Sequence, residues 1–397
     1  MSSPRKSAQK TRARVGPLAS VPASTATPLD VDALLADRHT GIIVCCGSGG
    51  VGKTTTSAAL ALRAAERGRK VVVLTIDPAR RLAQSMGIEQ LDNSPRPVTD
   101  VQGDGSLDAM MLDMKRTFDE VVESQATPAK AQQILSNPFY IALSSSFAGT
   151  QEYMAMEKLG QIHAQAQADG SYDLIVVDTP PSRSALDFLD APERLSSFLD
   201  GRFIRLLLAP AKGPAKLMSA GVGLVTNAMT KILGAQVLRD MQTFVAAFDT
   251  LFGGFRARAQ KTFELLQADG TAFLVVAAPE PDALREAAYF VERLSEDRMP
   301  LAGMIVNRAS PAPVGTLSAD EAMAAYARLE QRSTGTVAAG LLRLHADRSR
   351  LVERETKLRD RFAAAHPRVP TTVVPALAGD VHDLAGLRQV GELLARG

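Results

Sequence analysis

The stretch from Gly41 to Thr56 constrains the fold of this chain more than any other part of the sequence. Gly47, four further residues and then Gly52-Lys53-Thr54 match the phosphate-binding pattern G-x-x-x-x-G-K-[ST]. A short apolar run precedes this loop, and an Ala- and Leu-rich stretch with helical periodicity follows it and is closed by a glycine. The order of strand, loop and helix therefore predicts a P-loop.

The residue types in the loop fit the binding of a nucleotide's phosphates. Glycines let consecutive backbone N–H groups approach phosphate oxygens closely at the positive end of a helix. We expect Lys53 to reach the β and γ phosphates and the Thr54 hydroxyl to coordinate Mg²⁺. A glycine-rich turn without chemical function is the alternative, and the flanks on both sides argue against it. The predicted binding residues of the loop are Gly47, Ser48, Gly49, Gly50, Val51, Gly52, Lys53, Thr54 and Thr55.

The composition is that of a globular protein, with 46% hydrophobic and 22% charged residues. Apolar runs stay well short of the roughly 18 residues that a membrane-spanning helix needs, which argues against an integral membrane protein. The net charge of +2 includes five Lys and Arg residues that precede Asp30, so the remainder of the chain is slightly acidic. The sequence therefore shows no cluster of basic residues of the kind that would indicate nucleic-acid binding.

Residues 1–38 are rich in Ser, Pro, Ala and Thr and contain those five basic residues. This composition predicts a disordered basic tail. The tail lacks the apolar core of a secretory signal, although its Arg-containing, acid-poor character weakly resembles an organelle transit peptide. A docking arm is a further alternative for the same segment.

Cys45 and Cys46 are the two cysteines of the chain, and they are adjacent in the run before the P-loop. Neighbouring side chains of a strand point to opposite faces of a sheet. Two such residues cannot form a disulfide framework or a zinc site by themselves. A reducing, cytoplasmic location is therefore expected.

Apolar runs continue along the chain after the P-loop. Strands are expected at residues 41–46, 70–76, 109–112, 174–177, 273–278, 304–306 and 371–375. Helical patterns are expected at residues 54–67, 279–296, 318–362 and 384–394. We therefore predict one α/β domain over residues 39–397, with a mainly parallel sheet flanked by helices.

Two long helical stretches interrupt this alternation, at about residues 113–168 and 186–268. We expect these insertions to form a helical subdomain. Apolar residues recur at helical spacing between Leu217 and Phe255, and both insertions contain several methionines. Such stripes pack a core in most proteins, and methionine-rich ones can also line an adaptable groove for a hydrophobic client.

Two of the expected strands lead into an aspartate. Asp77 precedes Pro78, and Asp178 follows an apolar run of four residues. An Asp before a Pro is also a good helix start, so Asp77 is either a helix cap or a catalytic residue. P-loop proteins use an apolar strand that ends in Asp to hold the Mg²⁺ ion, whereas an ordinary strand-end turn is the alternative for Asp178.

These motifs together resemble the ArsA-type ATPase family, which includes the arsenite-pump subunit and the targeting ATPase for tail-anchored membrane proteins. The resemblance spans the nucleotide domain and is much more specific than the P-loop alone. The matching segments are residues 47–55, 75–79, 149–153, 178–181, 279–280 and 306–308.

The resemblance implies roles for several residues. Asp77 would orient the attacking water and take part in the metal site, and Asp178 would open the second switch at that site. Asn307 would contact adenine, and Pro375 completes the predicted nucleotide-binding set. ATP and ADP with Mg²⁺ are the expected ligands. The family is dimeric, with the nucleotide near the subunit interface and hydrolysis coupled to opening and closing of helical subdomains.

The sequence departs from the family at three places. Ser48 stands where members typically have a lysine that reaches the partner's phosphates, so we place the chain in a bacterial single-domain branch without that signature lysine. Arg80-Arg81 and Arg183-Ser184 also differ from the better-known branches in the switches. Cysteines other than Cys45 and Cys46 are missing, which argues against an arsenite pump.

The sequence thus predicts a cytoplasmic, Mg²⁺-dependent ATPase of the ArsA type with a hydrophobic or membrane-protein client. It would act as a homodimer with slow hydrolysis or as a heterodimer with a lysine-bearing paralogue. The principal alternative is an ATP-binding regulatory subunit of a heterodimer with little hydrolysis of its own. A phosphotransferase is a further alternative, whereas the weakly basic last helix argues against a membrane-partitioning ATPase.

Overall fold

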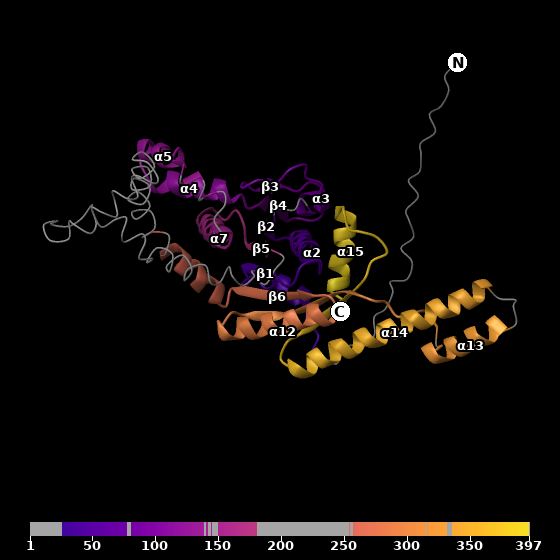
Figure 1. The fold of residues 1–397 in the computed structure, drawn as a ribbon. Helices are drawn as coiled ribbons and strands as arrows, with labels where there is room; N and C mark the ends of the chain where they lie inside the picture. Colours follow the sequence, from indigo (N-terminus) through magenta and orange to yellow (C-terminus); the bar gives the residue numbers. More distant parts are fainter. Residues whose placement is uncertain are drawn as a thin grey trace, which may run out of the picture.

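A computed structural model gives the fold and describes residues 26–77, 81–138, 140–141, 144, 150–180, 254, 257–315, 317–331 and 336–396. Its centre is one eight-stranded sheet (Figure 1). The strands are β1 (Ile42–Cys46), β2 (Lys70–Thr75), β3 (Arg96–Pro97), β4 (Ser106–Met111), β5 (Leu174–Asp178), β6 (Thr271–Ala277), β7 (Leu301–Ala309) and β8 (Thr371–Pro375).

The strand order is β3-β4-β2-β5-β1-β6-β7-β8, and all neighbouring pairs are parallel except β3 with β4. Every residue of β1, β5 and β6 is buried. Their almost unbroken apolar sequences follow from this burial, because helices cover both faces of a parallel sheet. The predicted α/β fold with a mainly parallel sheet is therefore confirmed.

Helices form a layer on each face of the sheet (Figure 1). They are α1 (Val31–Ala36), α2 (Lys53–Glu66), α3 (Arg81–Ser85), α4 (Met114–Gln125), α5 (Pro128–Leu135), α7 (Thr150–Asp169), α12 (Pro281–Glu296), α13 (Ala319–Gln331), α14 (Thr336–Ala365) and α15 (Leu384–Leu394). Cys45 belongs to the apolar core that α1, α2, α3 and α15 cover, whereas Cys46 belongs to the core that α4, α5, α7, α12 and the end of α14 cover. The two cysteines thus lie on opposite faces, as their adjacency predicts.

The prediction of a disordered tail over residues 1–38 is wrong for its last part. Residues 26–38 belong to the fold, because Pro28 forms a parallel bridge to Thr371 of β8 and α1 follows with Asp30 as its N-cap. Val31 and Leu35 of this short helix are fully buried. The composition did not indicate this, since two apolar anchors in a polar segment give a weak signal. Residues 1–25 lie outside the described part of the chain.

The helical pattern expected over residues 318–362 is divided between α13 and α14, which pack against each other through Ala319, Ala322 and Ala346. These small side chains let the two helices approach closely. The expected strand at 109–112 begins earlier, at Ser106, and β3 was not predicted, since a pair of residues carries no periodicity. The terminal helix at 384–394 is confirmed.

The first expected insertion, at about 113–168, contains α4, α5 and α7. Of the second, at about 186–268, the structure describes residue 254 and residues 257–268. The apolar stripe between Leu217 and Phe255, with its alternative as a client groove, lies outside the described residues.

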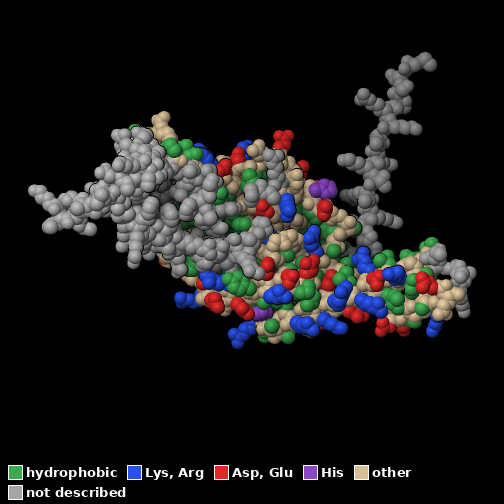
Figure 2. Space-filling model, in the orientation of Figure 1, with side chains coloured by type: hydrophobic (Ala, Val, Ile, Leu, Met, Phe, Trp, Pro, Cys, Tyr) green, Lys and Arg blue, Asp and Glu red, His purple; other side chains and the backbone are tan. Residues whose placement is uncertain are grey.

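Figure 2 shows positive and negative side chains interspersed over α12, α13 and α14, so this face is mixed in charge. Among the described helices, none is long and apolar enough to cross a membrane.

Candidate nucleotide-binding site

The loop between β1 and α2 has a backbone that only glycine fits at two points. Gly47 has a φ of 149°, and a Cβ atom there would lie 2.1 Å from the carbonyl oxygen of Val276. Gly52 has a φ of 91°, and its Cβ atom would lie 2.3 Å from Nδ2 of Asn307. The glycines of the predicted motif therefore hold this loop tightly against the ends of β6 and β7.

Lys53 begins α2, and its side chain turns back into the loop. The Lys53 Nζ atom donates hydrogen bonds to the carbonyl oxygens of Gly47, at 2.9 Å, and Ser48, at 2.7 Å. Only 5% of Lys53 is exposed, and this burial lowers its pKa, while the charge of Asp178 opposes the shift. The loop thus holds a desolvated ammonium group where the sequence predicts phosphate binding.

Asp178, at the end of β5, lies beside the loop. Its Oδ2 atom accepts hydrogen bonds of 2.8 Å from the hydroxyls of both Thr54 and Thr75. Its Oδ1 atom is buried and has no hydrogen-bond partner within the described structure. Burial raises the pKa of Asp178 to about 6, although both hydroxyls and Lys53 favour the charged form. A carboxylate with one unsatisfied buried oxygen next to a threonine hydroxyl offers the hard oxygen donors that Mg²⁺ prefers, so these residues fit the predicted metal.

Asp77 follows β2 by two residues and is partly buried. Its backbone N–H donates to the Thr75 hydroxyl at 3.2 Å, and its charge contributes to the raised pKa of Asp178. The structure therefore brings the two predicted acidic residues to the same edge of the sheet, next to the loop. Residues 78–80 and 181–253, which contain most of the segments expected to act as switches, lie outside the described residues.

The loop is also contacted from the far end of the chain, through an irregularity in β7. The pairing register between β7 and β8 shifts between Val306 and Ala309, and Asn307 and Arg308 occupy that shift. Asn307 Nδ2 donates to the carbonyl oxygen of Val51 at 2.8 Å, and Arg308 Nη1 donates to that of Gly50 at 2.8 Å. A bulge of this kind re-aims side chains, and here it aims two of them at the loop.

Pro375, the remaining residue of the predicted nucleotide-binding set, is buried at the end of β8 and pairs with Ala309. Pro375 and Asn307 lie at the same edge of the sheet, which is consistent with the prediction. The partner of Pro375 in β7, Ala309, is only two residues from Asn307.

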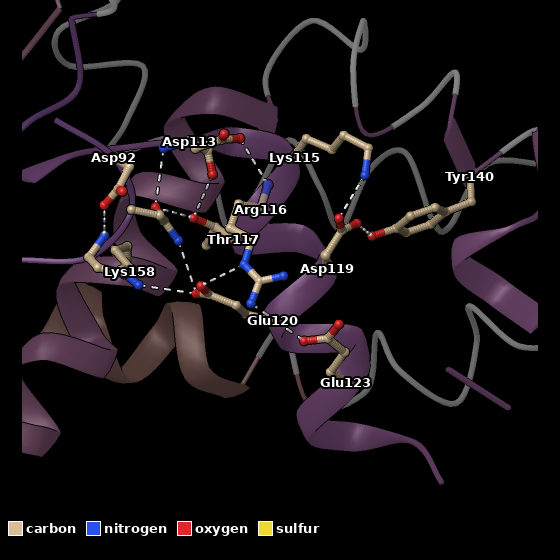
Figure 3. Close-up of polar contacts among 12 residues, drawn as sticks. Asp92, Asp113, Lys115, Arg116, Thr117, Asp119, Glu120, Glu123, Tyr140 and Lys158 are labelled. Carbon is tan, nitrogen blue, oxygen red and sulfur yellow. Dashed lines mark hydrogen bonds and ion pairs between the residues drawn. The ribbon is translucent and has the colours of Figure 1, made fainter. Parts of the chain in front are cut away.

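Polar contacts connect the first helical insertion to the segment that follows α3 (Figure 3). Buried Asn93 donates to Glu120 Oε2 of α4 at 3.0 Å, and Lys158 of α7 donates to the same oxygen at 3.1 Å. Tyr140 donates to Asp119 of α4 at 2.6 Å. The segment after α3 is thereby bound to α4, and the same glutamate joins α4 to α7.

Two contributors to the site were not assigned a role from sequence. Thr75 is the parallel partner of Asp178 in the pairing of β2 with β5, and this register places its hydroxyl on the carboxylate. Arg308 lies within a matching motif, but its contact with Gly50 depends on the bulge. The position of Thr75 at the end of a strand was a weak signal for its role. The positive charge of Arg308 within a matching motif was a similarly weak signal.

A parallel sheet with a glycine-rich loop between its first strand and helix, a loop-bound lysine and a strand-end Asp on the helix threonine defines a P-loop nucleoside triphosphatase. The family model described as "Anion-transporting ATPase" (ArsA) matches residues 40–357. The chain belongs to this ArsA family of ATPases.

Similar proteins carry names from the same family. An "ATPase ASNA1 homolog" of Cryptosporidium parvum is 27% identical over 262 residues, which cover 66% of this chain and 63% of that protein. "ATPase BagA" of Mycobacterium tuberculosis is 23% identical over 361 residues, covering 88% of this chain and 91% of that protein. "ATPase GET3" of Candida glabrata is 32% identical over 164 residues, covering 39% and 46%. The chain thus spans just under two thirds of the Cryptosporidium relative and most of the mycobacterial one.

Proposed function

We propose that this chain hydrolyses ATP in a Mg²⁺-dependent reaction and uses the nucleotide state to change the arrangement of its helical insertions. The observation that carries the proposal is the Asp178 carboxylate, which accepts hydrogen bonds from the P-loop Thr54 and from Thr75, while its second oxygen is buried and has no partner among the described residues. An uncompensated buried oxygen is costly, and a cation at this point would offset that cost.

The chain's own residues have distinct parts in this reaction. Lys53 would exchange the carbonyl oxygens of Gly47 and Ser48 for phosphate oxygens, and the loop N–H groups would bind the same phosphates. Asp77 would hold the attacking water in line with the γ-phosphate. Preorganised donors of this kind stabilise charge in the transition state without reorganising during the reaction.

Thr54, Asp77 and Asp178 would hold the Mg²⁺ ion, the acids directly or through water. A bound Mg²⁺ ion would offset the negative charge of the phosphates. The described residues contain no group of three or more His, Cys, Asp and Glu side chains suited to a metal. Most ligands of the ion would therefore come from hydroxyl, water and phosphate oxygens, as is usual for Mg²⁺ in nucleotide sites.

The contacts of Asn93, Glu120 and Lys158 support coupling between the site and the insertions, because they join the segment after α3 to α4 and, through Glu120, to α7. We propose a hydrophobic or membrane-protein client for the insertions, by analogy with the family. The proposed assembly is a dimer, either of two identical chains or with a related chain that supplies a lysine at the position of Ser48.

Ser48 favours a second candidate function, that of an ATP-binding regulatory subunit with little hydrolysis of its own. This chain lacks the cation that family members extend to the partner's phosphates. It could receive such a lysine from a different subunit but could not return one. Retention of both Asp77 and Asp178 favours the catalytic proposal.

The test is steady-state ATP hydrolysis by the purified chain and three variants, with the mass in solution measured in ATP and in ADP. We expect slow turnover by a dimer, at least tenfold acceleration by Ser48→Lys, and loss of turnover in Asp77→Asn, since a cation supplied in trans can be worth about 10³ in rate. Ser48→Met is the uncharged control of similar length and should not accelerate the reaction.

A different result would favour the regulatory subunit. If the wild-type chain binds ATP but stays monomeric, and Ser48→Lys leaves its hydrolysis negligible, the catalytic proposal fails. A chain that neither binds nor hydrolyses ATP would contradict both candidates.

A further inference from the structure

Arg308 has a backbone conformation that side chains rarely adopt. Its φ is 61°, and the other non-glycine residues with positive φ in the described chain are Asp100 and Arg298. Those two lie in turns, where left-handed residues are common, whereas Arg308 lies inside β7. Strained residues of this kind cluster at functional sites, and glycine would adopt the same backbone without strain.

Arg308 makes two hydrogen bonds in this conformation. Arg308 donates its backbone N–H to Asn307 Oδ1 at 3.0 Å and its guanidinium to the Gly50 carbonyl oxygen at 2.8 Å. Asn307 contacts the adjacent carbonyl, that of Val51. Two consecutive residues of β7 therefore hold two consecutive carbonyl groups of the P-loop.

Gly50 lies in the exposed part of the loop. It is exposed, has a φ of 77°, and an added Cβ atom would meet no atom of the described residues within 4 Å, so its backbone is not pressed against a neighbouring element there. Gly47 and Gly52, by contrast, are pressed against β6 and β7. Glycine has the greatest backbone freedom of any residue, so an unrestrained loop at Gly50 would have to be ordered when a nucleotide binds.

The guanidinium is available for this task. Arg308 is exposed, and in the part of the chain that the structure describes the Gly50 oxygen is the hydrogen-bond partner of its side chain. Most other arginines near the core, such as Arg63 and Arg258, are instead paired with carboxylates. The contact of Arg308 with the loop is therefore not a by-product of an ion pair.

We propose that Arg308 is a positioning residue that holds the exposed half of the P-loop ready for the nucleotide's phosphates, so that it sets nucleotide affinity and leaves the rate of bond cleavage nearly unchanged. This inference rests on the proposed nucleotide site. A loop that is already ordered gives higher affinity for the nucleotide, because the loop then loses little conformational entropy on binding.

The experiment measures the dissociation constant for ATP with Mg²⁺ by calorimetry, together with kcat where hydrolysis is seen. Arg308→Met removes the donor and keeps an unbranched side chain, and we expect about tenfold weaker binding with kcat within about twofold. Arg308→Lys keeps a donor that can approach Gly50 and should stay within about threefold of the wild type.

Arg308→Gly separates the side chain from the backbone. Glycine relieves the strain at φ 61°, so the melting temperature should not fall, yet ATP binding should be as weak as in Arg308→Met. Arg298→Met is the matched control, because Arg298 also has a positive φ, of 56°. It lies between α12 and the start of β7, at the amino ends of the strands, whereas the P-loop lies at their carboxyl ends. Arg298→Met should bind ATP as the wild type does.

Two outcomes would overturn the inference. One is wild-type affinity in both Arg308→Met and Arg308→Gly. The other is a loss of affinity that vanishes at about 0.5 M salt, because screening removes a general charge effect far more completely than the loss of a loop restraint. Failure of the proposed function can be told apart from these outcomes. A wild-type chain that binds ATP without hydrolysing it contradicts the ATPase proposal, yet the ATP affinities of all variants can still be compared.

Discussion

Asn307 follows Val51 by 256 positions in the sequence, and its side-chain amide donates a 2.8 Å hydrogen bond to the Val51 carbonyl oxygen. The same amide lies where a Cβ atom on Gly52 would be placed. The end of β7 and the P-loop are therefore packed closely against each other.

Gly52→Ala tests this fit. The added Cβ atom would lie 2.3 Å from Asn307 Nδ2, so it would displace the amide from Val51 as well as strain a φ of 91°. We expect ATP binding to weaken at least tenfold. Gly50→Ala is the comparison, because its φ of 77° is strained in the same way but no atom of the described residues lies within 4 Å of the new atom. The additional loss of affinity in Gly52→Ala therefore measures the contact with Asn307.

A double mutant makes the comparison sharper. Asn307→Ala added to Gly52→Ala should cost little more than Gly52→Ala alone, since both changes break the same contact and such effects are not additive. Fully additive losses, measured by calorimetry, would show that the two residues act independently.

The pH dependence of stability should report the buried carboxyl group of Asp178. Its pKa is raised from 3.8 to about 6 in the folded chain, so the folded state binds this proton more tightly than the unfolded state. The resulting stabilisation is complete below about pH 4 and is lost as the pH rises through about 6. Asp178→Asn removes this dependence.

The measurement is urea denaturation of both proteins without nucleotide and with a chelator. Between pH 7.5 and 4.5, the wild type should gain about 2 kcal/mol in the free energy of unfolding relative to Asp178→Asn, at 1.36 kcal/mol for each unit of pKa. Parallel curves for the two proteins would contradict the raised pKa.

A buried ion pair joins α7 to the helical residues 257–267. Glu157, 4% exposed, accepts hydrogen bonds from Arg258 Nε at 2.8 and 3.0 Å. Arg258→Ala leaves the buried Glu157 carboxylate without this cation, so we expect it to cost about 3 kcal/mol in the free energy of unfolding.

Arg285→Ala is the control for that loss, because Arg285 and its partner Asp282 are both largely exposed and such pairs contribute little. Thermal and urea denaturation should show no clear change in Arg285→Ala. A small effect of Arg258→Ala would mean that α7 and residues 257–267 are held together mainly by apolar contacts.

Much of the fold could be predicted from local patterns. Continuous apolar runs indicated seven of the strands near their observed positions, because a parallel strand buried on both faces leaves little room for polar residues. The spacing of Gly47, Gly52 and Lys53 identified the loop, since the phosphate-binding backbone demands glycine at fixed points. β3 and α1 escaped prediction because each is too short to show a period.

The candidate site could be predicted only in part. Lys53, Thr54 and Asp178 were predicted because each lies within a recognisable segment, and the structure brings them to one edge of the sheet. Thr75 was missed because its role depends on the register of β2 against β5, which no local pattern contains. The contacts of Arg308 depend on a shift in register between β7 and β8.

The sequence by itself determined the P-loop, the alternation of strands and helices and the family resemblance, because these depend on residue types at short spacing. Only the tertiary structure decided the strand order, the second restraint of the loop by Asn307 and Arg308, and the unsatisfied oxygen of Asp178. The physical reason is that parallel pairing joins residues far apart in the chain, and the register of that pairing depends on packing across the whole sheet.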